Sequence, residues 1–378
     1  MSPLTDTLAR HYDALFRCPF HQTVAATTVL TLTTSYLLLR STAPPPRTIP
    51  SPRVSPATKS TPYPPTVLPG SRLISTPHGT INVSEFGPAE GRRILLVHGI
   101  STPSIVFASL MPALASDGYR VMTFDLFGRG YSDAPQDVPY DERLYSTQIL
   151  YALQSSPVSW DKFSLVGYSL GGGISVAFAA HFANRLEALV LFAPSGLLKL
   201  NSLSLMAKLA RGGWVPAAIE RWMLGRQLAS REAVHKDDTP AEDGFDYAKI
   251  MQWQAKEHKG FPLAFGSSFR HGPIYDRQAE WEEAGKKGIP SMGVLIGADD
   301  DLVSPGLLGE MVMLLGGQER VRGEVLLGAD HNLVREKWRE CADFVADVVG
   351  DPEGIDDYES DNEAMHASTS SFGVVGDF

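Results

Sequence analysis

The sequence has few cysteines, and this limits the kinds of site it can form. Of 378 residues only Cys18 and Cys341 are cysteines, and they lie far apart in the chain. A disulfide framework and a Cys-x-x-Cys metal site are therefore excluded. The sequence also lacks nucleotide-binding and flavin-binding motifs. We expect neither a metal nor a cofactor.

Clusters of positive charge are also missing. The formal net charge is -10, but residues 351–363 hold seven acidic side chains and no Lys or Arg. Without that stretch about -3 remains, and no stripe rich in Lys and Arg is present to follow a phosphate backbone. Nucleic-acid binding is therefore not expected. Residues 350–378 are predicted to form an acidic disordered tail.

Long hydrophobic runs are scarce, and the one candidate lies in the N-terminal segment 1–42. Residues 23–39 carry no charge, but six of the seventeen are threonines. As a helix they would reach about 26 Å, the short limit for a bilayer span. We predict a single-pass anchor at about 23–39 and a membrane location. The alternatives are a cleaved secretory signal, a mitochondrial presequence or a peripheral helix.

Residues 43–70 form a proline-rich linker in this prediction. Ten prolines stand there among serines, threonines and a few basic residues. Such a composition favours extended chain over a packed core. The segment is therefore predicted to be a spacer ahead of the folded body.

From residue 71 onward, short apolar runs alternate with helical patterns. This alternation is typical of a mostly parallel sheet with helices on both faces. The predicted core covers residues 71–195 and 290–349. Its eight expected strands are 72–75, 81–86, 94–97, 120–124, 163–166, 188–192, 291–296 and 321–327.

Residues 196–289 interrupt this rhythm with helical patterns and no convincing buried strand. They are predicted to be an inserted helical cap. Four of the six tryptophans of the chain lie in it, namely Trp214, Trp222, Trp253 and Trp281. We expect most of these side chains to form the cap core and some to line an apolar pocket.

A Gly-x-Ser-x-Gly run at Gly167–Gly171 is the first candidate for chemistry. The apolar strand 163–166 precedes it, and a helix of small residues follows it. This strand, turn and helix form a nucleophile elbow, which holds a serine in a strained conformation above the sheet. Ser169 is the predicted nucleophile.

Three segments together resemble the α/β-hydrolase family of esterases, lipases and lactonases, over about residues 71–349. The first is the elbow. The second is Leu95-Leu96-Val97-His98-Gly99-Ile100, which is similar to the family's strand ending in His-Gly. The third is Asp125-Leu126-Phe127-Gly128-Arg129-Gly130-Tyr131-Ser132-Asp133, which is similar to its Asp-x-x-Gly-x-Gly-x-Ser segment.

The resemblance implies an oxyanion hole formed by the backbone amides of Ile100 and Leu170. It also implies that His98, Asp125 and Arg129 order the surrounding loops. An Asp nucleophile, as in the family's epoxide and halide hydrolases, is excluded because Ser169 occupies the elbow.

A serine hydroxyl needs a base and the base needs an acid. His331 follows the last expected strand, where the family has its histidine, although Asp330 stands where glycine is frequent. Asp300 follows the strand 291–296 at the family's usual spacing after Gly297, with Asp301 as the alternative. The order serine, acid, histidine is the order that this fold requires.

These residues predict a serine hydrolase that cleaves a carboxylic ester, with a small and lipophilic substrate as its partner. The same three residues would serve an acyltransferase, an amidase, a lactonase or a carbon–carbon bond hydrolase. A non-catalytic binding or scaffold protein on the same fold is the alternative from another class.

Overall fold

The computed structural model describes residues 19–39, 47–52, 61–202, 208, 211 and 243–351. It divides into two compact units, Met1–Pro46 and Arg47–Phe378. The predicted acidic tail from residue 352 lies outside the described residues, as do Trp214 and Trp222.

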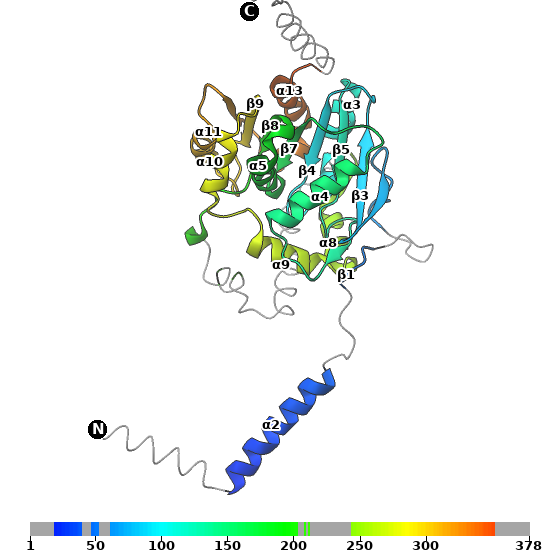
Figure 1. Cartoon of the computed structure of the whole chain (residues 1–378), viewed down its shortest axis with the longest axis vertical. Helices are drawn as coiled ribbons and strands as arrows, with labels where there is room; N and C mark the ends of the chain where they lie inside the picture. The colour runs from blue at the N-terminus through cyan, green and yellow to red at the C-terminus, as the bar shows by residue number, and fades with distance from the viewer. Residues whose placement is uncertain are drawn as a thin grey trace, which may run out of the picture. The chain divides into compact units, whose positions relative to one another are not determined.

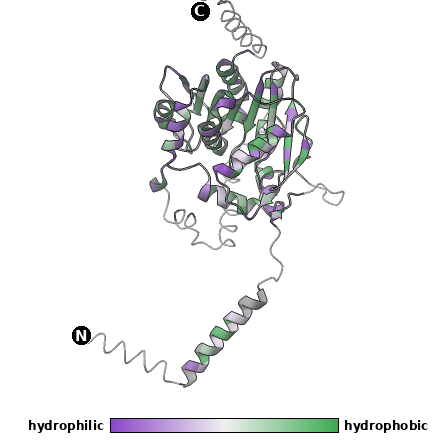
Figure 2. Cartoon of the chain, viewed as in Figure 1, coloured by the Kyte–Doolittle hydropathy of each residue, from purple (hydrophilic) through white to green (hydrophobic). Residues whose placement is uncertain are grey.

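In the first unit the described residues form one helix, α2 (Pro19–Leu39). Among the described residues, no helix combines the length and the apolar character that a membrane crossing requires. The segment 23–39 is helical, and its role as an anchor stays a prediction. Its six threonines dilute the hydropathy, and Figure 2 shows pale turns between the green ones.

The second unit is built on the eight-stranded sheet that the sequence predicts. The strands are β2 (Arg72–Thr76), β3 (Gly79–Phe86), β4 (Arg93–Val97), β5 (Arg120–Phe124), β7 (Phe163–Tyr168), β8 (Leu186–Phe192), β9 (Ser291–Gly297) and β10 (Val321–Leu326). Their spatial order is β10-β9-β8-β7-β4-β5-β3-β2. The strand β3 pairs antiparallel with β2 and β5, and the other neighbouring pairs in this sheet are parallel.

Helices cover both faces of the sheet (Figure 1). One layer contains α4 (Glu142–Gln154), α5 (Leu170–Phe182), α10 (Gln278–Lys286) and α11 (Leu308–Leu314). The other contains α3 (Leu110–Ser116), α12 (Leu333–Glu336) and α13 (Trp338–Val349). Because successive side chains of a strand point to opposite faces, Leu95 joins the first apolar layer and Leu96 the second. The predicted fold class is confirmed.

Part of the proline-rich segment packs against the body, and this differs from the predicted spacer. β1 (Thr48–Ile49) pairs with β6 (Ala134–Pro135), and the Ser51 amide donates to Asp133 at 2.7 Å. Tyr63 is buried, with its ring 5.3 Å from that of Tyr131 and 5.8 Å from that of Trp253. Burial of the Tyr63 ring thus holds this part of the proline-rich segment against the body.

The described part of the predicted cap contains α8 (Tyr247–Glu257), α9 (Phe261–His271) and α10. Trp253 is buried beside Tyr131, whereas Trp281 of α10 packs into the layer that contains α5. The helix α10 therefore belongs structurally to the sheet-covering layer. The helices α8 and α9 lie near the carboxyl ends of the strands (Figure 1).

Candidate active site

The turn between β7 and α5 carries Ser169. Its backbone has φ 55° and ψ -118°, a conformation that residues with a side chain rarely adopt. The turn is this tight because α5 approaches β4 closely: a Cβ on Gly171 would lie 2.0 Å from the Val97 carbonyl oxygen. The half-buried Ser169 side chain is thereby held at the carboxyl end of the sheet.

His331 lies directly beside this serine. It follows β10, and its Nε2 is 3.0 Å from Ser169 Oγ. Its Nδ1 is 2.8 Å from Asp300 Oδ2. A proton on Nδ1, donated to the carboxylate, leaves Nε2 free to accept the serine proton. Three residues from three different loops therefore form one hydrogen-bonded chain.

Of the three consecutive aspartates, only Asp300 is buried. Its Oδ1 accepts hydrogen bonds from the amides of Leu302 and Val303, at 2.9 and 2.8 Å. Its other oxygen faces His331. Asp299 and Asp301 are exposed on either side. The structure thus brings Asp300, and not the alternative Asp301, to the histidine.

The loop after β4 places the Ile100 amide. The buried His98 accepts from the Leu126 amide at Nε2, at 2.8 Å, so its proton sits on Nδ1 and is donated to the Gly99 carbonyl at 2.8 Å. Burial lowers the pKa of His98 to about 3, which keeps the ring neutral. Because a trans peptide points its N–H away from its carbonyl, the Ile100 amide points away from His98.

Gly99 of this loop lies close to the serine. A Cβ on Gly99 would lie 3.2 Å from Ser169 Cβ and 3.6 Å from its Oγ. The Leu170 amide is the first of α5, and a helix offers no acceptor to its first amides. Of the two predicted oxyanion-hole residues, Leu170 thus follows Ser169 directly, and Ile100 follows Gly99, which lies beside the serine.

Two further side chains order the Ile100 loop, as the sequence predicts. Arg129 is fully buried and donates from Nε to the Ile100 carbonyl at 3.0 Å. Asp125 accepts from both the amide and the hydroxyl of Ser104 at the end of the loop. Burial raises the pKa of Asp125 while these hydrogen bonds oppose the shift.

The histidine loop has its own support, which the sequence did not reveal. Tyr168, the residue before Ser169, donates from its hydroxyl to the His331 carbonyl at 2.9 Å. Burial raises the pKa of Tyr168, so the phenol stays protonated and remains a donor. The strand β7, which ends at Tyr168, thus also holds the loop of His331.

A family model described as the alpha/beta hydrolase fold matches residues 92–337, about two thirds of the chain. The chain belongs to the α/β-hydrolase family. The match begins before β4 and ends after the loop of His331, so it contains every site residue described above.

Individual relatives of this α/β-hydrolase match only part of the chain, at about 30% identity. A serine hydrolase-like protein of Danio rerio is 28% identical over 137 residues, which are 36% of this chain and 41% of the relative. A 2-hydroxymuconate semialdehyde hydrolase of Pseudomonas sp. strain CF600 is 31% identical over 110 residues, which are 28% of this chain and 38% of the relative. The chain therefore matches less than half the length of either protein.

Among solved structures, the enol-lactonase of Burkholderia xenovorans LB400 superposes with a TM-score of 0.55. The superposition covers 73% of this chain and 98% of the lactonase, at 20% sequence identity. At 20% identity, this similarity shows a shared fold only.

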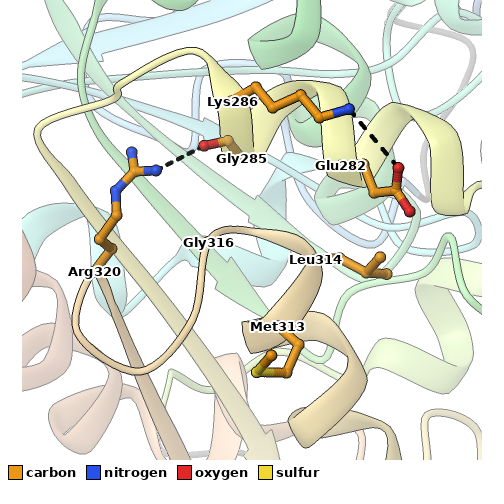
Figure 3. A pocket seen from close by; sticks show the side chains of 7 residues that line it. All are labelled: Glu282, Gly285, Lys286, Met313, Leu314, Gly316 and Arg320. Carbon is orange, nitrogen blue, oxygen red and sulfur yellow. Dashed lines mark hydrogen bonds and ion pairs between the residues drawn. The ribbon is translucent and has the colours of Figure 1, made fainter.

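One surface hollow of this α/β-hydrolase lies apart from these loops. It has a volume of about 410 Å³ and is lined by residues of α10, α11 and the segment before β10 (Figure 3). Lys286 pairs with Glu282 along α10, and Arg320 donates to the Gly285 carbonyl. The lining contains no serine, cysteine or histidine, so the hollow offers no second site of the Ser169 kind.

Proposed function

We propose that this protein hydrolyses carboxylic esters through an acyl-enzyme formed on Ser169. The observation that carries the proposal is the continuous hydrogen-bonded chain from Ser169 Oγ through His331 to Asp300, with distances of 3.0 and 2.8 Å. Family membership supports a hydrolytic reaction, and the buried carboxylate supports a histidine that can hold positive charge.

In the proposed reaction, His331 Nε2 takes the proton as Ser169 Oγ attacks the ester carbonyl carbon. The carbonyl oxygen becomes an oxyanion between the amides of Ile100 and Leu170. His331 then gives its proton to the leaving alcohol oxygen, and the acyl group stays on Ser169. Water repeats the sequence and releases the acid. Asp300 holds the tautomer and offsets the charge on the imidazolium throughout.

A lipophilic group on the substrate fits the neighbourhood of the serine. The turn after α9 lies on the start of α5, since a Cβ on Gly272 would be 3.4 Å from Leu170 Cδ1. The helix α9 also carries Leu263, which is partly exposed, and the apolar Phe265. We infer that the acyl or alcohol group of the ester contacts these apolar side chains of the predicted cap, the insertion 196–289.

The first experiment measures hydrolysis of p-nitrophenyl esters of increasing acyl length by the wild type and by Ser169→Ala. We expect the substitution to lower kcat by about 10⁴-fold or more while leaving the fold intact. The acyl length with the highest kcat/KM reports the size of the apolar site. Full activity of Ser169→Ala would refute the proposal.

The adjacent aspartates provide a matched control. Asp300→Asn removes the carboxylate that orients His331, and we expect a loss of kcat of about 10⁴-fold. Asp301→Asn makes the same chemical change on an exposed neighbour and should leave kcat near that of the wild type. Adding a competing alcohol and analysing products separates hydrolysis from acyl transfer.

A further inference from the structure

The loop that carries the Ile100 amide is held by three consecutive carbonyl groups. Gly99 accepts from His98, Ile100 accepts from Arg129, and Ser101 accepts from Gln254 Nε2 at 2.9 Å. His98 and Arg129 belong to the core, whereas Gln254 comes from α8 of the insertion. One of the three bonds that shape the loop is therefore supplied by the insertion.

Gln254 is fully buried, and both ends of its amide are used. Its Oε1 accepts from the Gly130 amide at 2.9 Å, while its Nε2 donates to Ser101. Since a backbone amide only donates and a carbonyl only accepts, these partners fix the orientation of the side chain. Gln254 thus ties α8 to two loops of the core at once.

Arg129 makes a parallel connection to α9. Besides the bond to Ile100, its Nη2 donates to Ser268 Oγ at 2.8 Å, and Ser268 lies 2.6 Å from the Tyr145 hydroxyl. Within the described residues Arg129 has no carboxylate partner, so neutral groups alone hold it. Gln254 of α8 therefore contacts the Ile100 loop directly, whereas Ser268 of α9 is connected to it through Arg129.

We propose that Gln254 is a positioning residue for the oxyanion hole. While α8 is seated on the core, Gln254 fixes the Ser101 carbonyl, two peptide units after the Ile100 amide. It thereby supports the loop conformation that His98 and Arg129 set at the Gly99 and Ile100 carbonyls. The insertion then helps to stabilise the transition state as well as to bind the substrate. This inference rests on the proposed function of Ser169 and Ile100.

The test compares Gln254→Met with Tyr247→Phe. Methionine matches glutamine in length but can neither donate to Ser101 nor accept from Gly130. Tyr247 is a matched control because it lies on the same helix and its hydroxyl has two acceptors outside the turn at Ile100: Asp243 Oδ2 at 2.5 Å and the Ile105 carbonyl at 3.1 Å. Both variants lose a side-chain hydrogen bond made from α8.

Three quantities are measured for each variant: kcat, KM, and the inhibition constant of a trifluoromethyl ketone, which forms a tetrahedral adduct with an oxyanion. For Gln254→Met we expect kcat to fall roughly 10- to 100-fold, with the ketone weakened by a similar factor and KM little changed. Tyr247→Phe should keep all three values close to those of the wild type.

Two results would overturn the role of Gln254. One is a folded Gln254→Met enzyme with wild-type kcat and wild-type affinity for the ketone. The other is an equal loss in Tyr247→Phe, which would assign the effect to general packing of α8. Failure of the proposed function is seen separately, as full ester hydrolysis by Ser169→Ala.

Discussion

His258 shows how a single buried polar side chain holds the insertion to the core. It caps the C-terminal end of α8, where its Nε2 donates to the Ser132 carbonyl at 2.9 Å and its Nδ1 accepts from the Gly260 amide at 3.2 Å. This arrangement requires a neutral ring. Burial, with a smaller effect from nearby Arg129, lowers the pKa of His258 to about 4, although Asp133 acts in the opposite direction.

The depressed pKa of His258 predicts a loss of stability in mild acid. The unfolded chain takes up a proton at about pH 6.5, the folded chain only at about pH 4. Stability is therefore full above pH 6.5 and falls as the pH drops towards 4, by up to about 3 kcal/mol from this group. Denaturant titrations across this range measure the slope.

The control for this prediction is His258→Gln, which keeps a donor for Ser132 but does not titrate. Its stability should depend on pH less steeply than that of the wild type by about one proton between pH 4 and 6.5. Equal slopes in the two proteins would show that His258 is not the group responsible. His98, whose pKa is also lowered by burial, is present in both proteins and contributes equally to the pH dependence of their stability.

At the scale of elements, the reactive turn depends on contact between the start of α5 and the end of β4. The residues Gly171 to Gly173 have no side chains, and α5 is buried along most of its length. This explains why a helix so poor in polar residues follows the nucleophile. The strain at Ser169 is held in place by packing on both sides.

Gly171→Ala is expected to destabilise the fold, because the new methyl group would lie 2.0 Å from the Val97 carbonyl oxygen and push α5 away from β4. We expect a loss of about 1–3 kcal/mol or more, together with the loss of esterase activity. Gly309→Ala is the opposite case: it lies in α11 with nothing within 4 Å. That change should stabilise the protein by about 0.5–1 kcal/mol. Thermal melts of both variants test the contrast.

The sequence predicts strands well where the burial of apolar side chains determines their position. The five central strands β4, β5, β7, β8 and β9 are mainly apolar and buried, and all eight strands lie within two residues of their expected ranges. The contribution of Gln254 was not predictable, because one glutamine in an amphipathic helix carries no local signal. Tyr63 and Tyr168 were missed for a similar reason: their partners are distant in sequence.

At the scale of the whole molecule, the prediction for residues 43–70 was the least accurate. Composition predicted a spacer there, but Tyr63 and Leu68 are buried against the body. The anchor predicted at 23–39 stays a prediction. The compartments considered for the protein, namely a membrane, secretion or mitochondria, stay predictions.

Two N-terminal truncations should distinguish the contribution of the first compact unit to stability from that of residues 47–70. A chain that begins at Arg47 loses only the first compact unit and should melt at the temperature of the full-length protein. A chain that begins at Ser71 also loses β1 and the buried Tyr63. For that chain we expect a decrease of at least about 6 °C in Tm. Equal Tm values for the two shortened chains would contradict the packing role of residues 47–70.

The order of the site residues along the chain has a consequence for biosynthesis. Ser169 and His331 are 162 positions apart, with the insertion and β9 between them. At about 5–20 residues per second, a ribosome needs roughly 10–30 s to add that stretch. Throughout this interval the nascent chain already contains its serine but no base to activate it. On the proposed mechanism, the chain therefore gains esterase activity only after β10 and the loop of His331 have been synthesised.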